Sequence, residues 1–187
     1  MSPCATGPAA AATARLFLAL LPGPAVRAAV DQHAQAWRWP PQAAPYAPAD
    51  WHVTLHFIGA VPRTRLAELK SALDVPLAPF ELRFGVPMLW PHGLAVLLPM
   101  AVPPALQRLH DQLGVRLRRL GLRTDERAYR PHLTLARRAE EALPSPPPAW
   151  GWSVRGYVLM ESTGRPEARY RVLQHYGQAE DGGLLPP

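Results

Sequence analysis

Cysteine, lysine and long apolar runs are scarce in this sequence. Cys4 is the only cysteine among 187 residues, so neither an internal disulfide nor a cysteine-based zinc site is expected. A single cysteine is typical of proteins in a reducing compartment, and we expect the cytoplasm. No apolar run reaches the roughly 20 residues of a membrane-spanning helix, so we expect no membrane partner. Residues 1–14 lack the basic start of a signal peptide and are expected to form a flexible tail.

Two further absences narrow the class of enzyme. None of the five serines lies in a Gly-x-Ser-x-Gly turn, which argues against a serine hydrolase of the α/β type. The sequence also has no glycine-rich loop of the kind that wraps nucleotide phosphates.

The charge is basic and comes almost entirely from arginine. The chain has 20 Lys and Arg residues against 14 Asp and Glu residues, and Lys70 is the only lysine. Its formal net charge of +6 favours an anionic partner, and the planar guanidinium suits phosphate. The arginine count alone is better explained by a GC-rich genome, which would also raise alanine and proline.

The pattern of apolar residues, prolines and glycines predicts one domain over residues 15–176, followed by a flexible tail over 177–187. Strands and helices are mixed without strict alternation, which is typical of an α+β fold. Helices are expected over 63–74 and from Pro24 and Pro104, since proline suits a first helical turn. The expected strands span residues 15–21, 51–59, 80–90, 93–100, 129–137, 151–160 and 168–175.

A repeat is visible within this domain. The order strand, proline-started helix, loop, strand occurs twice, from Arg15 to His52 and again from Gly93 to His132. Each unit ends in a strand that contains His-x-Thr-Leu. Two such units predict a pseudo-two-fold arrangement in which the two His-x-Thr strands face each other.

These strands carry residues suited to acid–base chemistry on a phosphate. Alternation places His52, Thr54 and His56 on one face of the first strand, and His132 and Thr134 on one face of the second. In each motif the histidine and the threonine two residues later are then roughly 6.6 Å apart along the strand. Two imidazoles can supply one general base and one general acid near neutral pH. Two hydroxyls can donate hydrogen bonds to phosphate oxygens, so a cyclic phosphate could be opened without a metal or cofactor.

Zinc binding is the alternative use of His52 and His56. Their spacing of four residues suits a metal pair on a helix, but on a strand it spans roughly 13 Å. The β-branched and aromatic residues between them favour the strand. We therefore expect neither a metal nor another cofactor.

The segments Trp51–Gly59 and Arg130–Arg137 resemble the paired His-x-Thr motifs of the 2H phosphoesterases. Within that group the chain is similar to the bacterial RNA 2′,3′-cyclic phosphodiesterases, also called LigT-like or 2′-5′ RNA ligase proteins. The resemblance covers about residues 15–176 and includes the opening Arg15-Leu-Phe. It implies a bilobal fold with a cleft between two antiparallel sheets and helices on the outside. It also implies hydrolysis of RNA 2′,3′-cyclic phosphate ends to 2′-phosphomonoesters.

The resemblance also implies roles for individual residues. His52 would donate a proton to the leaving 3′ oxygen, and His132 would activate water. The sequence alone leaves open which histidine is the acid, because the halves are pseudo-symmetric. Thr54 and Thr134 would hold phosphate oxygens, and Phe17 lies where an aromatic residue could stack on a base.

Two arginines are candidates for a phosphate contact. Arg137 matches the family's position, but ideal alternation puts it on the face opposite His132, so a bulge or a strand end is needed. Arg130 has the same parity as His132. His56 departs from the family pattern, and we expect it to serve a structural role or to line the rim of the groove.

Hydrolysis of RNA cyclic phosphate ends is therefore the leading hypothesis. A 2′-5′ RNA ligase, or a phosphodiesterase for small cyclic or 2′-5′-linked nucleotides, is the alternative within enzymes. An inactive module that binds RNA ends is the alternative outside them, and its binding would depend strongly on salt. Nothing in the sequence argues for more than a monomer.

Overall fold

The computed structural model describes residues 12–178 and 184–185. Within these residues the α-helices are α1 (Pro24–Gln35), α2 (Leu66–Ala72) and α3 (Pro104–Arg119), with 3-10 turns η1 (Pro48–Asp50), η2 (Arg63–Arg65), η3 (Pro91–Gly93) and η4 (Pro166–Ala168). The strands are β1 (Thr13–Leu20), β2 (Ala44–Pro45), β3 (Val53–Pro62), β4 (Phe80–Trp90), β5 (Leu94–Pro99), β6 (Leu133–Arg137), β7 (Gly151–Val154), β8 (Gly156–Ser162), β9 (Tyr170–Gly177) and β10 (Leu184–Leu185).

The strands form one continuous antiparallel sheet that consists of two halves. The strand order is β10-β7-β4-β5-β6-β3-β1-β8-β9, and β2 pairs with β6 outside this path. β6 and β3 are joined by one residue pair, Val53 with Leu133. One lobe therefore holds β3, β1, β8 and β9, and the other holds β6, β5, β4, β7 and β10. The two sheets that the family resemblance implies are continuous through this single residue pair, and the expected α+β bilobal architecture is confirmed.

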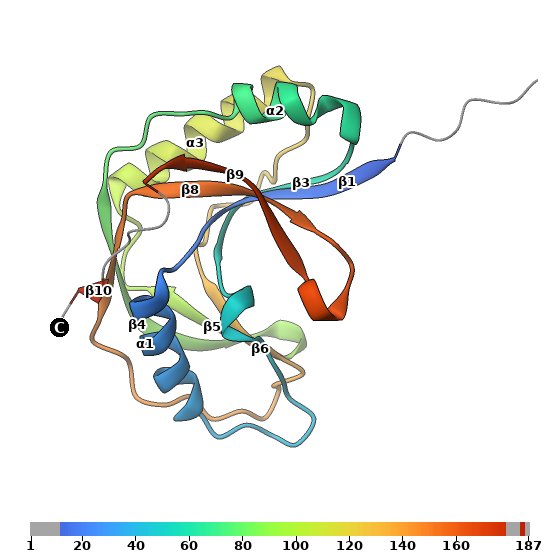
Figure 1. The fold of residues 1–187 in the computed structure, drawn as a ribbon. Helices are drawn as coiled ribbons and strands as arrows, with labels where there is room; N and C mark the ends of the chain where they lie inside the picture. Colours follow the sequence, from blue (N-terminus) through green and yellow to red (C-terminus); the bar gives the residue numbers. More distant parts are fainter. Residues whose placement is uncertain (1–11, 179–183, 186–187) are drawn as a thin grey trace, which may run out of the picture.

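In each repeat, the helix packs against the lobe that does not contain the strand before it. α1 follows β1, yet its His33 contacts Ser145 beyond β6, at 3.1 Å between Nδ1 and Oγ. α3 follows β5, yet the carbonyl of its His110 lies 2.8 Å from Nε2 of His56 on β3. In Figure 1, α3 accordingly runs along the lobe of β3 and β8, while α1 lies in the half of the view that holds β4 and β5. The crossed helices thus join two lobes whose strands, within the described residues, are linked by one residue pair.

Apolar residues at helical spacing bury one face of each long helix. Val26, Val30 and His33 are the buried residues of α1, and the helix begins at Pro24 as the sequence predicts. α3 begins at Pro104 and buries a leucine stripe consisting of Leu106, Leu109, Leu113 and Leu117. No helix among the described residues combines the length and apolar composition that crossing a membrane requires.

The ends of the domain differ from the sequence-based boundaries. β1 begins at Thr13, and Ala14 is buried, so the ordered chain starts before the expected residue 15. β9 runs to Gly177, and β10 pairs with β7 within the expected C-terminal tail. The other positions of the two expected tails, residues 1–11, 179–183 and 186–187, lie outside the described residues.

Candidate active site

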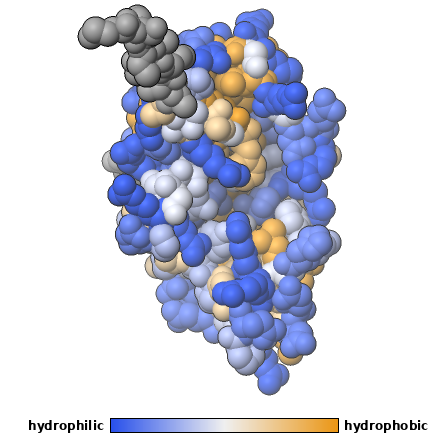
Figure 2. Space-filling view, turned by 90° about the vertical axis from the view of Figure 1, so that its right-hand side faces the viewer, coloured by the Kyte–Doolittle hydropathy of each residue, from blue (hydrophilic) through white to orange (hydrophobic). Residues whose placement is uncertain are grey.

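A cavity of about 400 Å³ opens where the two lobes meet. Both histidines and both threonines of the repeated motif line it, so the structure brings together the four residues that the sequence singles out: His52, Thr54, His132 and Thr134. On the face shown in Figure 2, hydrophilic residues dominate, and hydrophobic residues gather in small groups between them. The residues that line the cavity are likewise a mixture of polar and apolar ones.

The single strand pair between the lobes explains this convergence. Val53 and Leu133 directly follow the two histidines, and they pair in antiparallel register. Such a register sets His52 beside Thr134 and Thr54 beside His132 on the same face of the two strands. The four side chains therefore form two crossed imidazole–hydroxyl pairs around one pseudo-two-fold axis.

The two imidazoles are held in the same way. Nδ1 of His52 lies 2.7 Å from the carbonyl oxygen of Asp50, and Nδ1 of His132 lies 2.8 Å from that of Arg130. A carbonyl can only accept, so each Nδ1 carries the hydrogen, and each neutral ring leaves Nε2 as a proton acceptor. The backbone two residues earlier thus sets both tautomers.

Burial makes both rings neutral near pH 7. It lowers the pKa of His52 to about 4, and the nearby charge of His132 adds to this effect against the opposing hydrogen bond to Asp50. Burial also lowers the pKa of His132, with the hydrogen bond to Arg130 acting in the opposite direction. An anionic phosphate in the cavity would stabilise the imidazolium form and raise both values.

Aromatic rings fix the planes of the two imidazoles. The ring of Tyr170 contacts His52 edge-on, at 5.0 Å between ring centroids. The ring of Phe17 also packs against His52, at 5.1 Å. Trp90 packs on His132 at 4.5 Å. Sequence reasoning missed the roles of Tyr170 and Trp90, because they lie far from the motifs along the chain and have no spacing relation to them.

A bulge in β6 brings Arg137 into the cavity. Val96 of β5 pairs with Thr134 while its neighbour Ala95 pairs with Ala136, so Leu135 is the extra residue. The bulge reverses the alternation after Leu135, and Arg137 lines the same cavity as Thr134. The family's position for this arginine is therefore compatible with the strand.

A similar bulge in β3 turns His56 away from the face of His52 and Thr54, in keeping with the structural role that we expect for it. Leu18 pairs with His56 and Ala19 with Thr54, so Leu55 is the extra residue. His56 is 4% exposed and faces α3. The prediction that it shares a face with His52 and Thr54 is wrong, since it lies in the packing between β3 and α3. Phe57 instead lines the cavity.

Two other predicted contacts are placed differently. The guanidinium of Arg130 lies 4.8 Å above the ring of Trp90, and Arg130 is not among the residues that line the cavity. The backbone carbonyl of Arg130, which fixes His132, is its link to the site. Phe17 lines the cavity wall but is 3% exposed, so of these two phenylalanines it is Phe57 that presents an open ring to the cavity.

The loop after α1 contributes residues that no motif indicated. Tyr46 is buried in the cavity wall, and its ring lies 5.5 Å from the guanidinium carbon of Arg137 and 5.1 Å from that of Arg169. Asp50 forms an ion pair with Arg169 at 3.7 Å. The ring of Tyr46 thus packs against the guanidinium of Arg137, while the carboxylate of Asp50 is paired with Arg169.

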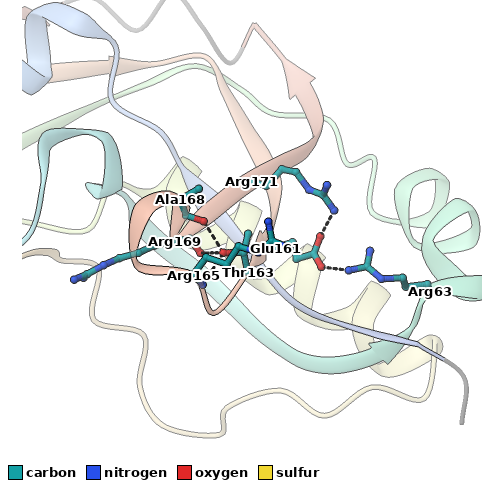
Figure 3. A network of polar contacts seen from close by, with 7 residues as sticks. All are labelled: Arg63, Glu161, Thr163, Arg165, Ala168, Arg169 and Arg171. Atoms are coloured by element: carbon teal, nitrogen blue, oxygen red, sulfur yellow. Dashed lines mark hydrogen bonds and ion pairs between the residues drawn. The ribbon is translucent and has the colours of Figure 1, made fainter.

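A polar network braces the β8–β9 hairpin at the edge of the cavity (Figure 3). Glu161 is buried and accepts hydrogen bonds from Arg63 and, at 2.6 Å, from Arg171. Burial opposes ionisation of Glu161, but these bonds lower its pKa. In the turn, Thr163 Oγ1 donates to the carbonyl of Ala168 at 2.5 Å. These contacts hold the turn end of the hairpin, which carries Ser162 and Tyr170 into the cavity.

The structure also bears on zinc. His52 and His56 lie on different faces of β3 and cannot share one ion. Over residues 12–178 and 184–185, no three His, Cys, Asp or Glu side chains gather as a metal site would require.

Comparison with known proteins identifies the family. The sequence profile of the 2′-5′ RNA ligase superfamily matches residues 24–164. The chain is 33% identical over 154 residues to the RNA 2′,3′-cyclic phosphodiesterase of Escherichia coli K12, covering 77% of this chain and 85% of that protein. It is 28% identical over 106 residues to the protein of the same name in Bacillus subtilis 168, covering 52% of this chain and 58% of that protein.

A solved structure agrees with these sequence relatives. The crystal structure of E. coli LigT complexed with 3′-AMP superposes with a TM-score of 0.78 at 28% identity, covering 89% of this chain and 98% of that one. With its paired His-x-Thr strands meeting in one cavity, this chain belongs to the 2′-5′ RNA ligase superfamily.

Proposed function

We propose that this protein hydrolyses the 2′,3′-cyclic phosphate ends of RNA to 2′-phosphomonoesters. The observation that carries the proposal is the crossed arrangement of two imidazoles and two hydroxyls in one cavity, with each imidazole held through Nδ1. The names of the two bacterial relatives support the same substrate.

The proposed reaction is one in-line displacement at phosphorus. Nε2 of His132 accepts a proton from water as the water oxygen attacks, and the bond between phosphorus and the 3′ oxygen breaks. His52, charged in the complex with the anionic substrate, gives its proton to that 3′ oxygen. The product keeps its phosphate on the 2′ oxygen. The choice of His52 as the acid follows the family resemblance, because the two sites have the same local geometry.

Three side chains would stabilise the negative charge of the transition state. Thr54 and Thr134 lie beside opposite imidazoles and can donate to different non-bridging oxygens. Arg137 supplies a fixed positive charge whose own position depends on the ring of Tyr46. Donors placed in advance cost no reorganisation as the charge develops.

Replacement of either histidine tests this mechanism. With an RNA oligonucleotide that ends in a 2′,3′-cyclic phosphate, His52→Ala and His132→Ala should each lower kcat by about 100-fold or more, since each removes a proton carrier. His175→Ala, on β9 and outside the cavity lining, is the matched control and should keep full activity. A folded single mutant with near-normal turnover would contradict the two-histidine mechanism.

Removal of metal ions is a separate test. Because the proposed reaction uses no metal, activity should survive excess EDTA. A loss of activity in EDTA that added zinc restores would contradict metal independence.

A modified substrate separates the two roles. A cyclic phosphate whose 3′ oxygen is replaced by sulfur has a leaving group that needs no proton. His52→Ala should recover much of its activity on this substrate, whereas His132→Ala should not. The opposite rescue would exchange the two assignments.

Ligation is the second candidate function, and the name of the matching superfamily favours it. The same residues could direct the 5′ hydroxyl of a second RNA end at phosphorus in place of water, so that the bond to the 3′ oxygen breaks and a 2′-5′ linkage forms. Incubating the cyclic phosphate oligonucleotide with a 5′-hydroxyl acceptor distinguishes the two, because ligation gives a longer RNA and hydrolysis gives a 2′-phosphate. Tight, salt-sensitive binding of the same oligonucleotide without either product would indicate an RNA-end-binding module instead.

We further propose that the chain acts as a monomer in the cytoplasm. Both His-x-Thr motifs lie in the same chain, so a second copy is not needed to supply either of them. The single cysteine suits a reducing compartment.

A further inference from the structure

His132 is connected to Arg130 in two ways. The backbone carbonyl of Arg130 holds Nδ1 of the imidazole at 2.8 Å. The guanidinium of the same residue lies 4.8 Å above the ring of Trp90, and that ring packs on the imidazole at 4.5 Å between centroids. These two contacts bring the guanidinium within about 9 Å of the imidazole, which is about one Debye length at 0.1 M salt.

The chain around Arg130 and Trp90 fixes both of them. Pro131 is buried and follows Arg130, so the backbone of Arg130 is confined to extended conformations. Trp90 ends β4 and pairs with Leu94 across the η3 turn. The indole N–H of Trp90 donates to Sδ of Met88 at 3.2 Å. A proline and a β-hairpin therefore hold the guanidinium, the indole and the imidazole in one stack.

The equivalent position before His52 carries the opposite charge. Asp50 stands two residues before His52, as Arg130 stands two residues before His132, and its carbonyl holds Nδ1 in the same way. The carboxylate of Asp50 is paired with Arg169. Two uncharged rings pack on His52, those of Phe17 and Tyr170. The two histidines thus share a backbone arrangement, but the stack that contains a cation belongs to the proposed base.

A cation in this stack has a defined effect on His132. Burial is the main reason why the pKa of His132 is lowered; the hydrogen bond to the Arg130 carbonyl opposes this, and the charge of Arg130 adds to it. A base that takes a proton from water must be neutral before the attack. Because like charges repel, the Arg130 guanidinium favours the neutral imidazole.

Other titratable and charged groups face His132 from the elements around it. His52, which directly precedes β3, is close enough for the charge of His132 to lower its pKa. On the side of β4, His92 is exposed in the η3 turn. The remaining groups line the cavity: Arg15, Tyr46, Asp50, Arg137 and Tyr170. A substitution of Arg130 alters none of them, so its effect on His132 can be measured separately.

We infer that Arg130 and Trp90 form one positioning unit for His132, in which the indole sets the plane of the imidazole and the guanidinium on the indole disfavours protonation of that imidazole before water is activated. This inference rests on the proposed function, in which His132 is the base. Neither Arg130 nor Trp90 is among the residues that line the cavity, so both act through His132. Arg130 then has this role in place of the direct phosphate contact that the sequence suggests.

An NMR titration of the free protein tests the effect of the charge. The Cε1–H signal of His132, identified by its loss in His132→Ala, reports the midpoint of its titration. Arg130→Gln should raise that midpoint by about 0.3 pH unit at low salt, the size expected for a unit charge about 9 Å away in water. Arg130→Lys should stay close to the wild type, and salt at about 1 M should remove the difference. An unchanged midpoint in Arg130→Gln would overturn the inference.

The pH dependence of kcat/KM tests whether the charge matters for the reaction. With the cyclic phosphate oligonucleotide, Arg130→Gln should lower kcat/KM about twofold at the acid end of the profile, where His132 is protonated, and the loss should disappear towards pH 8. Arg108→Gln, at an exposed arginine of α3, is the matched control and should not alter the profile. The same loss at every pH would show a merely structural role, and a higher KM with an unchanged profile would show a phosphate contact. Either result would overturn the inference.

A double-mutant cycle tests whether Trp90 carries the effect. Trp90→Leu removes the ring that orients the imidazole and seats the guanidinium, so kcat at pH 8 should fall several-fold with little change in KM, whereas Trp90→Phe should keep most of it. Adding Arg130→Gln to Trp90→Leu should shift the NMR midpoint no further, because the two residues act together. Trp39→Leu removes a half-buried ring stacked on Trp37 outside the cavity lining, and this control should keep kcat. A second full shift in the double variant would show that the two residues act separately.

The failure of this inference can be told apart from failure of the proposed function, because the NMR titration needs no substrate. If the wild-type protein opens the cyclic phosphate but Arg130→Gln changes neither the midpoint nor the pH profile, the positioning unit is wrong and the hydrolase stands. If the wild-type protein opens no cyclic phosphate, the proposed function itself is wrong, and a shifted midpoint would still show that Arg130 acts on His132.

Discussion

At the scale of single residues, the site depends on partners that a sequence motif does not contain. The two His-x-Thr pairs are recognisable because their spacing and their repetition are properties of the chain itself. The rings that orient them are not recognisable in this way, because Tyr170 and Trp90 reach the histidines only after folding. The distinction between Phe17 and Phe57 as the exposed ring also depends on packing that alternation does not reveal.

Tyr129 provides a prediction at this scale. Its hydroxyl donates to the carbonyl of Thr54 at 3.2 Å, and its ring stacks on His110 at 4.1 Å. Tyr129→Phe keeps the stack and removes the hydrogen bond, so the backbone that positions the Thr54 hydroxyl loosens. We expect kcat to fall several-fold with little change in KM, and the free energy of unfolding to fall by about 1 kcal/mol.

Tyr157→Phe is the matched control for that variant. The Tyr157 hydroxyl is buried, accepts from the Val75 N–H at 2.7 Å and donates to the Leu73 carbonyl at 2.9 Å, away from the cavity. Its loss should destabilise the fold at least as much as Tyr129→Phe and leave kcat unchanged. Steady-state kinetics below the unfolding transition would decide. Equal kcat values for the two variants would show that Tyr129 is only structural.

At the scale of elements, bulges decide which residues face the cavity. The strands around both motifs are predictable from apolar alternation, and the helices from their leucine spacing and proline starts. Alternation correctly places the first histidine and threonine of each motif, and then fails after Leu55 and Leu135. A bulge changes the parity of all later residues, and nothing in the composition of these two strands marks where it occurs. Alternation therefore places His56 on the wrong face, whereas Arg137 reaches the cavity through the bulge that the sequence analysis requires for it.

Arg137 and Arg138 form a pair that tests the bulge. In a regular strand Arg138 would share the face of His132 and Thr134, but with the bulge Arg137 does so. Arg137→Gln should lower kcat/KM for the cyclic phosphate oligonucleotide by about 100-fold, because it removes a positive charge from the cavity in which we propose that the phosphate binds. Arg138→Gln, outside the cavity lining, should change it by less than about twofold. A larger effect at Arg138 would mean that β6 is regular in solution.

At the scale of the whole molecule, histidines occupy the contacts between the crossed helices and the lobes. His33 of α1 accepts a hydrogen bond from the Trp37 indole N–H at 3.1 Å and meets Ser145 of the other lobe. His56 stacks on His110 of α3 at 4.1 Å between ring centroids. The pseudo-two-fold repeat predicted two lobes, but not that each helix would cross to the opposite one. Such crossing depends on how the loops after α1 and α3 close, and sequence periodicity carries no information about that.

These contacts make the stability of the whole fold depend on pH. Burial lowers the pKa of His33, His52, His56, His110 and His132 below 6.5 in the folded protein, to about 4 for His52 and His56. The unfolded chain therefore binds protons first as the pH falls. The stabilisation from neutral, packed histidines is complete above pH 6.5 and is lost progressively from there towards pH 4.

Urea unfolding at pH 7.5, 6 and 5 measures this effect. The unfolding free energy should fall steeply over this range, and His56 alone should contribute about 2 kcal/mol of the loss by pH 5. His56→Phe keeps a ring between β3 and α3 but cannot be protonated, so its unfolding free energy should decline less steeply with pH than that of the wild type. The hydrogen bond to the His110 carbonyl is lost at every pH, and the comparison therefore uses the slope rather than the level. Parallel pH dependence in the two proteins would show that His56 does not titrate differently in the folded and unfolded chains.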